Sequence, residues 1–275
     1  MKRGRYIPLP NDQRLVCDII DLARKTPFAP VQVEVDLREL SRLRRRCTPR
    51  IAWPVIVMRA YALVSREIPE LRQVYSPFPW PRIYQHDESV CLMAIYRQED
   101  EQRCLRFARF CQPENYSLLQ LQQQFDDLRK LPLSQLRSLR HQAKFAALPF
   151  WIRRLGWKVL THLMPASRAR QMGTFGMSMS GVGRVKGTYH LSPATSTVGY
   201  DPLCRRGQAH LTLTFDHRIL NGKPAQEVLE ALVSMLKDRV RNELCMLAKQ
   251  NPDNSEAAET VSGGAQGQTS VQRAA

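Results

Sequence analysis

The sequence predicts an α/β protein in which helices pack on a mixed sheet. Stretches with a two-residue apolar period, typical of half-buried strands, alternate along the chain with stretches of helical period. The chain has 275 residues, of which 43% are apolar, so it is long enough to bury one large core or two small ones. No stretch approaches the roughly 18 uninterrupted apolar residues that a membrane span needs. We therefore expect a globular domain.

Strands are expected where apolar residues alternate with polar ones or form a short run. The segment VQVEVD places a valine at every second position, as a half-buried strand does. The segment SVCLMAIYR is a continuous apolar run of strand length, typical of a buried strand. With three further segments, the expected strands cover residues 31–36, 89–97, 174–179, 195–200 and 209–215.

Helices are expected where apolar residues recur at three- and four-residue spacing. Two of them occupy residues 12–25 and the basic stretch 37–46. Pro54 is acceptable in the first turn of a third, and Ser117 is a suitable N-cap for a fourth. The last expected helix begins after Asn221-Gly222.

The chain is expected to form one domain over residues 1–250. After Gln250, the segment 251–275 has too little apolar surface to offset the entropy of ordering it, so a disordered tail is expected there. The opening residues MKRGRYIPLPNDQ lack the apolar core of a signal peptide. The expected location is therefore the cytoplasm.

The positive charge of the chain is unevenly distributed. The formal net charge is +16, and the segment 128–200 contains twelve basic residues and no acidic one. Such a segment favours a phosphate-bearing partner, an anionic membrane or nucleic acid, or it is a solvated face. Nucleic acid is the weakest of these interpretations, because no nucleic-acid-binding motif accompanies the charge.

The seven cysteines do not indicate a disulfide framework or a metal site. They form no C-x-x-C pair and lie far from any histidine at zinc-ligand spacing. We expect reduced thiols and no bound metal.

The segment LTLTFDHRILNG (211–222) carries the main candidate for chemistry. Its apolar residues share one strand face by the two-residue period, and His217 has the same parity if the strand continues. An apolar environment disfavours imidazolium and leaves a neutral ring that accepts a proton near neutral pH. His217 is therefore a candidate general base, with a structural histidine at a strand end as the alternative.

Four motifs, in order along residues 6–240, carry a resemblance to a known family. FDHRILNG resembles the DHR-x-x-DG signature of the acyltransferase domain of 2-oxo acid dehydrogenase complexes, the dihydrolipoamide acyltransferases. GTFGMSMSG (173–181) resembles the family's GTF-x-x-S-x-x-G segment. YIPLPNDQR resembles its PL-x-x-x-R opening, and VQVEVDL resembles its first core strand.

The resemblance implies a two-layer sandwich of the chloramphenicol acetyltransferase-like type and an acyltransferase in stand-alone form. It gives His217 the role of general base that activates a hydroxyl, thiol or amine acceptor, and Ser178 the role of hydrogen-bond donor to the oxyanion. The implied donor is a coenzyme A or carrier-protein thioester, used as a co-substrate, and the acceptor is a small molecule or a lipid. The implied assembly is a homotrimer with its active site between subunits.

Asn221 departs from the pattern of the family, which usually has aspartate there. The resemblance pairs that aspartate with an arginine that steadies the histidine loop, and Arg14 matches this partner best. Asparagine still accepts a hydrogen bond from Arg14 but loses the charge-assisted part of the interaction. A catalytically silent trimeric scaffold or binding module is therefore the alternative to an enzyme.

The segment 133–172 matches the family poorly and is expected to be an atypical basic amphipathic insertion. It combines Phe145, Phe150, Trp151 and Trp157 with basic residues, a composition typical of an interfacial helix or of a cover over a long acyl chain. A simple helical hairpin packed on the core is the alternative. The first interpretation adds an acyl carrier protein or an anionic membrane surface as a partner, and a peripheral location at the membrane.

Overall fold

The computed structural model describes residues 6, 8–99, 102–179, 192–201 and 207–250. The elements in chain order are α1 (Asn11–Ala23), β1 (Phe28–Asp36), α2 (Arg38–Arg46), α3 (Trp53–Glu67), β2 (Gln73–Ser76), β3 (Arg82–Gln85), β4 (Val90–Glu99), β5 (Gln102–Cys111), α4 (Leu118–Lys130), α5 (Arg137–Ala147), α6 (Phe150–His162), α7 (Pro165–Met172), β6 (Phe175–Met179), β7 (Ser196–Tyr200), β8 (Gln208–Asp216), α8 (Gly222–Met235) and α9 (Arg241–Lys249). Three short 3₁₀ helices (Pro69–Arg72, Pro113–Asn115 and Leu133–Gln135) and a π-helical turn (Leu236–Val240) complete them.

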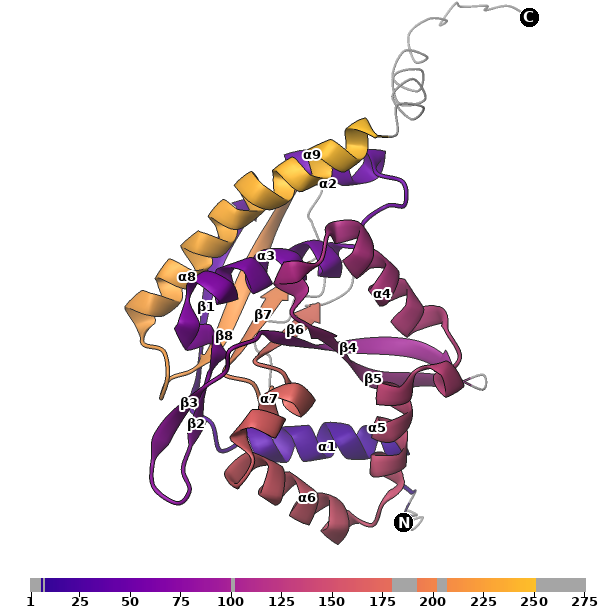
Figure 1. The fold of residues 1–275 in the computed structure, drawn as a ribbon, viewed down its shortest axis with the longest axis vertical. Helices are drawn as coiled ribbons and strands as arrows, with labels where there is room; N and C mark the ends of the chain where they lie inside the picture. The colour runs from indigo at the N-terminus through magenta and orange to yellow at the C-terminus, as the bar shows by residue number, and fades with distance from the viewer. Residues whose placement is uncertain (1–5, 7, 100–101, 180–191, 202–206, 251–275) are drawn as a thin grey trace, which may run out of the picture.

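In the described part of the chain, six strands form one mixed sheet in the order β1-β8-β7-β6-β4-β5 (Figure 1). Strand β6 runs parallel to both β4 and β7, and the other neighbours are antiparallel. Strands β2 and β3 form a separate hairpin. The expected α/β class, with helices on a mixed sheet, is confirmed.

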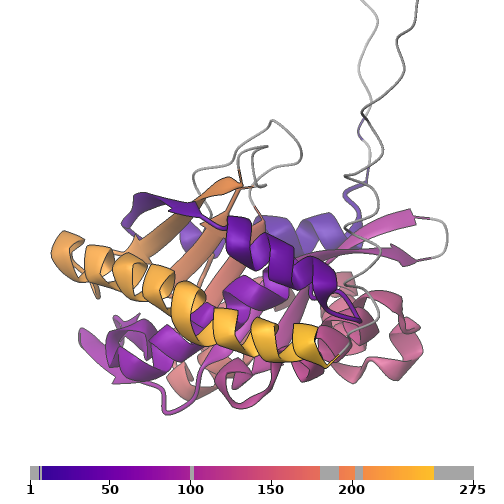
Figure 2. The ribbon, with the colours of Figure 1, turned by 90° about the horizontal axis from the view of Figure 1, so that it is seen from above.

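One face of the sheet carries the apolar core. Helix α3 is buried along most of its length, and α8 packs on β1 and β8. The ring of Tyr61 in α3 lies 4.9 Å from the ring of Phe175 in β6, and its hydroxyl donates a hydrogen bond to Ser196 in β7. Helices α8 and α9 continue each other across the sheet, with α2 beside α9 (Figure 2). Apolar burial therefore holds this side together.

The opposite face of the central strands is polar. Phe175 and Met177 in β6 are core residues, so the two-residue period turns Gly176 and Ser178 to the other face. The strand register continues this face with small or hydroxyl residues in β7 and β8: Thr197, Gly199, Thr212 and Thr214. This row is a polar surface inside the fold, and we call it the polar sheet face.

Side chains from two helices cover the free edge of β5. The backbone N–H of Leu105 donates to the Asp12 carboxylate of α1, 3.3 Å away. The Gln142 side chain of α5 accepts from the Phe107 N–H at 3.0 Å and donates to the Phe107 carbonyl at 3.2 Å. An edge strand otherwise presents unpaired backbone groups to other chains, so these contacts close the sheet.

A buried ion pair attaches α6 to α1. The Arg153 guanidinium donates two hydrogen bonds to the Asp18 carboxylate, at 2.8 and 3.1 Å, and Trp157 Nε1 donates a third at 3.0 Å. Arg153 and Asp18 are both buried. The ring of Phe145 in α5 packs edge-on against Trp157, with centroids 5.1 Å apart. Arg153 is thus a structural residue of the basic segment and does not belong to its exposed face.

The predicted N-cap Ser117 is confirmed, because it caps α4 in a reciprocal capping box with Gln120. The expected tail, 251–275, lies outside the described residues. None of the helices in the described part of the chain is both long and apolar enough to cross a membrane.

Candidate active site

His217 lies in a tight turn directly after β8. The Asp216 carboxylate accepts a hydrogen bond from the backbone N–H of Arg218, two residues on, at 3.0 Å. The same carboxylate is bridged by the Arg218 guanidinium, with Nη2 2.7 Å from Oδ2. The His217 N–H donates to the carbonyl of Pro27 at 3.0 Å. Asp216 and Arg218 therefore fix the turn that presents His217.

The prediction that His217 is buried on the apolar face is wrong. Strand β8 ends at Asp216, because the Asp216 side chain closes a turn there and stops the strand period. The His217 side chain is exposed, with its ring 5.7 Å from the ring of Phe215. This exposure leaves the ring accessible to a substrate or to a second subunit.

A second arginine, Arg168, binds backbone carbonyls of segments next to the His217 turn. Arg168 in α7 donates to the carbonyl of Tyr75 at 3.2 Å and to that of Pro193 at 2.9 Å. Burial, and the positive charge of Arg218, lower the pKa of Arg168 to about 10, while Asp216 opposes the shift. The Arg218 guanidinium lies 4.3 Å from the centre of the Tyr75 ring, a cation–π contact. Arg168 and Tyr75 are supporting residues that the sequence did not reveal.

Ser178 is placed by the start of β6, where the GTF motif has a structural role. Gly173 ends α7 with φ of 79°, and a Cβ there would lie 2.9 Å from the Val90 carbonyl oxygen, so glycine is required. Thr174 then exchanges hydrogen bonds with the backbone of Val90 and sets the register of β6 against β4. Four residues after Thr174, Ser178 is half-buried on the polar sheet face.

Within one chain, His217 and Ser178 are not brought together. Ser178 pairs with Gly199, which pairs with Thr212, so Ser178 is level with Thr212 of β8. His217 lies five residues beyond Thr212, just after the C-terminal end of β8. At roughly 3.3 Å per residue, the two side chains are about 17 Å apart along the sheet alone. One copy of the chain does not hold both side chains against one substrate carbonyl.

The predicted clamp between Arg14 and Asn221 is also not formed within one described chain. Asn221 is the N-cap residue of α8, is exposed, and makes no capping hydrogen bond with its side chain. Arg14 donates to the carbonyl of Leu9 at 3.1 Å, and no hydrogen bond between Arg14 and Asn221 occurs among the described residues. The role of Arg14 stays a prediction.

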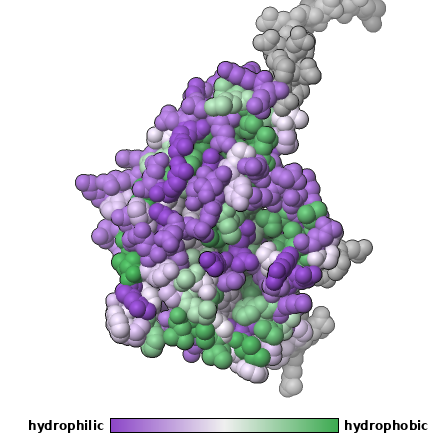
Figure 3. All heavy atoms as spheres, viewed as in Figure 1, coloured by the Kyte–Doolittle hydropathy of each residue, from purple (hydrophilic) through white to green (hydrophobic). Residues whose placement is uncertain are grey.

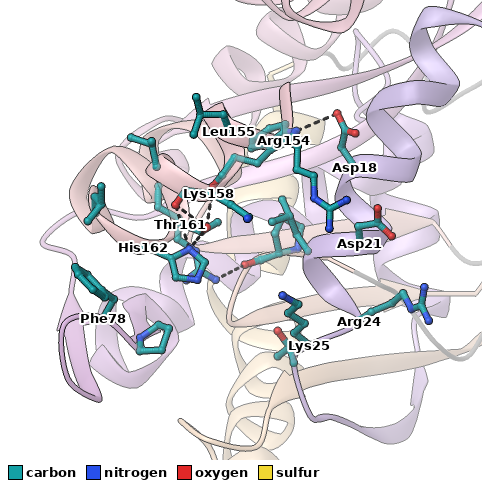
Figure 4. A pocket seen from close by; sticks show the side chains of 18 of the residues that line it. Asp18, Asp21, Arg24, Lys25, Phe78, Arg154, Leu155, Lys158, Thr161 and His162 are labelled. Atoms are coloured by element: carbon teal, nitrogen blue, oxygen red, sulfur yellow. Dashed lines mark hydrogen bonds between the residues drawn. The ribbon is translucent and has the colours of Figure 1, made fainter. Parts of the chain in front are cut away.

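A cleft of about 940 Å³ opens beside the His217 turn. It lies between α1, α6 and the β2–β3 hairpin, and Arg218 reaches its wall (Figure 4). His217 is not among the described residues that line it. The helix α6 comes from the segment 133–172, so the part of the sequence with the least family resemblance builds one wall of this cleft.

Metal-binding groups are not clustered in the described residues. No set of three or more histidine, cysteine, aspartate or glutamate side chains there is arranged to hold an ion. Among the described cysteines, five are free thiols: Cys17, Cys47, Cys91, Cys111 and Cys245.

Comparison with known proteins gives a match in structure and none in sequence. No protein-family model matches the chain, and no curated protein matches it significantly. Among solved structures, a truncated catalytic core of the 2-oxoacid dehydrogenase complex from Thermoplasma acidophilum is similar with a TM-score of 0.60 and 14% identity, over 86% of this chain and 99% of that one. The fold is that of a dihydrolipoamide acyltransferase core.

Two further structures share this acyltransferase-core fold. Dihydrolipoamide acetyltransferase of Azotobacter vinelandii has a TM-score of 0.59 and 15% identity, over 88% of this chain and 94% of that one. That structure addresses the roles of a serine, a histidine and, four positions after the histidine, an asparagine in catalysis. A probable dihydrolipoamide acetyltransferase of Listeria monocytogenes has a TM-score of 0.57 and 15% identity, over 85% and 94% of the two chains.

Proposed function

We propose that this protein is an acyltransferase that moves an acyl group from a coenzyme A or carrier-protein thioester to a hydroxyl, thiol or amine acceptor. The observation that carries the proposal is the exposed His217, presented by the Asp216–Arg218 turn at the end of β8 in an acyltransferase-core fold. An exposed ring on a fixed turn suits a base that must meet a substrate from outside the subunit.

The proposed chemistry uses two side chains of the chain. His217 takes the proton of the acceptor as its hydroxyl, thiol or amine attacks the thioester carbonyl. The carbonyl oxygen becomes an oxyanion, which accepts a hydrogen bond from the Ser178 hydroxyl. Collapse of the tetrahedral intermediate breaks the carbon–sulfur bond, and the leaving thiolate takes the proton back from His217. The products are the acylated acceptor and a free thiol.

The positions of the two side chains require more than one copy of the chain. Ser178 and His217 lie at opposite ends of the central strands, so His217 of one copy acts with Ser178 of another. A closed ring of identical subunits repeats the same contact around its axis, and each contact then completes one site. A homotrimer with its active sites between subunits satisfies this requirement.

Asn221 is compatible with this function. The Azotobacter acetyltransferase has an asparagine four positions after a histidine in its catalytic mechanism, and Asn221 stands four positions after His217. The asparagine at this position is therefore a weaker argument for a silent scaffold than the sequence pattern suggested. The alternative is a catalytically silent trimer, and the mixing experiment distinguishes it from an active enzyme.

The test is subunit mixing. His217→Ala is expected to lower the rate of thiol release from an acyl-CoA panel by about 10² to 10⁴-fold, since it removes the base. Ser178→Ala is expected to lower it by about 10²-fold, since it removes an oxyanion donor. Co-refolding equal amounts of the two variants restores about one quarter of wild-type activity, because random assembly pairs an intact histidine with an intact serine at that fraction of contacts.

The outcomes separate the two candidate functions. Full activity of His217→Ala would remove the catalytic assignment. Two inactive variants that regain nothing on mixing would show that the two side chains do not meet across a subunit contact. A wild-type trimer that is inactive against the whole panel of donors and acceptors would support the silent scaffold.

A further inference from the structure

Helix α6 carries an apolar ridge that faces solvent. Trp151, Leu155, Val159 and Leu163 follow each other at four-residue spacing, which places them on one side of the helix. Three of them are more than half exposed: Trp151 (68%), Leu155 (61%) and Leu163 (58%). Apolar side chains gather over α6 at the lower edge of the molecule in Figure 3. We call this row the α6 ridge.

A second row of α6, parallel to the ridge, is basic, and it lines the cleft together with Leu155, Val159 and Leu163 of the ridge. Arg154, Lys158 and His162 are exposed, also at four-residue spacing, and all three border the cleft (Figure 4). Arg24 and Lys25 at the end of α1 face them across it. The hairpin between β2 and β3 adds Phe78 to the cleft and the exposed Trp80 nearby in the chain.

The cleft is positive after its ion pairs are taken into account. The Asp18 carboxylate is satisfied by Arg153, which lies outside the cleft, and Arg218 is neutralised by Asp216. Among the described residues, no ion pair joins Arg24, Lys25, Arg154 or Lys158 to a carboxylate, and Asp21 adds one negative charge to the wall. Anionic groups are therefore attracted to the cleft.

The combination of an apolar row and a basic row fits a bilayer surface as the ligand better than it fits a soluble anion. A free anion needs the cations alone and gains nothing from the adjoining ridge. An amphipathic helix at a membrane places its apolar side chains at the boundary of the acyl chains while its basic side chains contact the lipid phosphates. Helix α6 has 13 residues, about 20 Å in length, so it lies along a bilayer and does not cross it.

We propose that the cleft and the α6 ridge bind the surface of an anionic phospholipid bilayer. Lipid phosphates occupy the mouth of the cleft between Lys158 and Lys25, and Trp151 and Leu155 enter the headgroup region. The proposal does not depend on acyl transfer, because the residues of the ridge are distinct from His217 and Ser178.

The test is sedimentation of the full chain with lipid vesicles. The wild-type protein is expected to sediment with vesicles of phosphatidylcholine mixed with phosphatidylglycerol and to stay in solution with phosphatidylcholine alone. Arg154→Glu/Lys158→Glu is expected to weaken binding by at least about 30-fold, since each lost cation alone costs roughly fivefold. Trp151→Ser/Leu155→Ser is expected to weaken binding as well, with no change in the oligomeric state measured by light scattering.

The matched control is Arg42→Glu/Arg46→Glu. These exposed arginines are also four residues apart on a helix and give the same change in net charge, but α2 lies at the opposite end of the molecule (Figure 1). The control is expected to bind vesicles within about threefold of wild type, as distant charges are screened.

Four results would overturn the proposal. One is a wild-type protein that does not sediment with anionic vesicles. Another is an equal loss of vesicle binding in Arg154→Glu/Lys158→Glu and in the control Arg42→Glu/Arg46→Glu, which would show that net charge alone attracts the protein to the vesicles. Complete competition by inorganic phosphate at constant ionic strength would assign the cleft to a soluble phosphate ligand. Dissociation of the oligomer by Trp151→Ser/Leu155→Ser would assign the ridge to a second copy of the chain.

Discussion

The sheet with α3 and α8 and the helical segment α5–α7 are stabilised in different ways. The first region is closed by apolar side chains, of which Phe175 and Leu213 are fully buried. The second is attached to α1 by the buried pair of Arg153 and Asp18, while several of its large apolar side chains face solvent. The difference teaches that the helical segment is attached inside by a polar contact while it leaves apolar surface exposed to solvent.

The largest expected effect of a single change lies in the apolar region. Phe175→Ala should lower the free energy of unfolding by about 4 kcal/mol, because it leaves a cavity and removes the contact with Tyr61. Phe150→Ala, in the exposed part of α6, is the matched control and should change it by less than about 0.5 kcal/mol. Urea unfolding at fixed protein concentration measures both, and similar losses would remove the distinction between the regions.

The buried ion pair gives the next effect. Arg153→Met alone should cost about 3 kcal/mol, since it leaves the Asp18 carboxylate buried without its cation. Arg153→Met combined with Asp18→Leu should cost less than either single change, because no charge is then left buried. The exposed pair of Asp36 and Arg38 is the control, and its removal should leave unfolding almost unchanged. Additive losses at Asp18 and Arg153 would show that the pair is not coupled.

A pH-dependent effect is expected where the two regions meet. Burial, and then Arg168 of α7, lower the pKa of His86 to about 4 from 6.5. The unfolded chain therefore binds a proton between these values and the native chain does not, so stability is present above pH 6.5 and is lost as the pH falls toward 4. The loss should be about 3 to 4 kcal/mol, since each unit of pKa difference corresponds to about 1.4 kcal/mol.

His86→Phe tests this assignment because it keeps a ring beside Tyr84 and removes the titration. Its free energy of unfolding should fall less steeply over this pH range than that of the wild type. His141→Phe, on the exposed side of α5, should keep the wild-type slope. Parallel slopes for wild type and His86→Phe would show that other groups carry the acid sensitivity.

The smallest expected effect is that of the α6 ridge on folding. Trp151→Ser and Leu155→Ser should each change the free energy of unfolding by less than about 0.5 kcal/mol, because the side chains are mostly exposed already. A loss above about 2 kcal/mol in thermal or urea unfolding would mean that the ridge is covered within the native assembly and would weaken the contrast between the two regions.

Strands with a clear apolar pattern were predictable from the sequence. A strand whose apolar pattern is interrupted by a buried charge was not. The segment 89–97 is strand β4, and the alternation in 31–36 marks β1, which extends back to Phe28. Strand β5 was missed because Arg106 occupies a buried position, where Glu99 pairs with it at 2.6 Å. A charge in a core position hides the apolar pattern, and only the structure reveals its partner. The order of the strands depends on long-range pairing that no local pattern contains.

The sequence motifs singled out candidate site residues but did not indicate how those residues are arranged. The resemblance of the motifs to the acyltransferase family singled out His217, Ser178 and Asn221, and the structure places the first two at opposite ends of the central strands. The expected burial of His217 failed because strand parity says nothing about where a strand ends. The supporting Arg168 was one of twelve basic residues in its segment, with no local signal that it would bind the carbonyls of Tyr75 and Pro193.

The separation of Ser178 from His217 has a consequence for gene dosage. A site shared between copies exists only while the copies are assembled, so at concentrations where subunits dissociate, activity falls faster than the amount of protein. For the proposed shared site, expression would set a threshold below which the protein is inactive even though every molecule is folded. Two defective alleles, one lacking the histidine and one lacking the serine, would complement each other in the same cell.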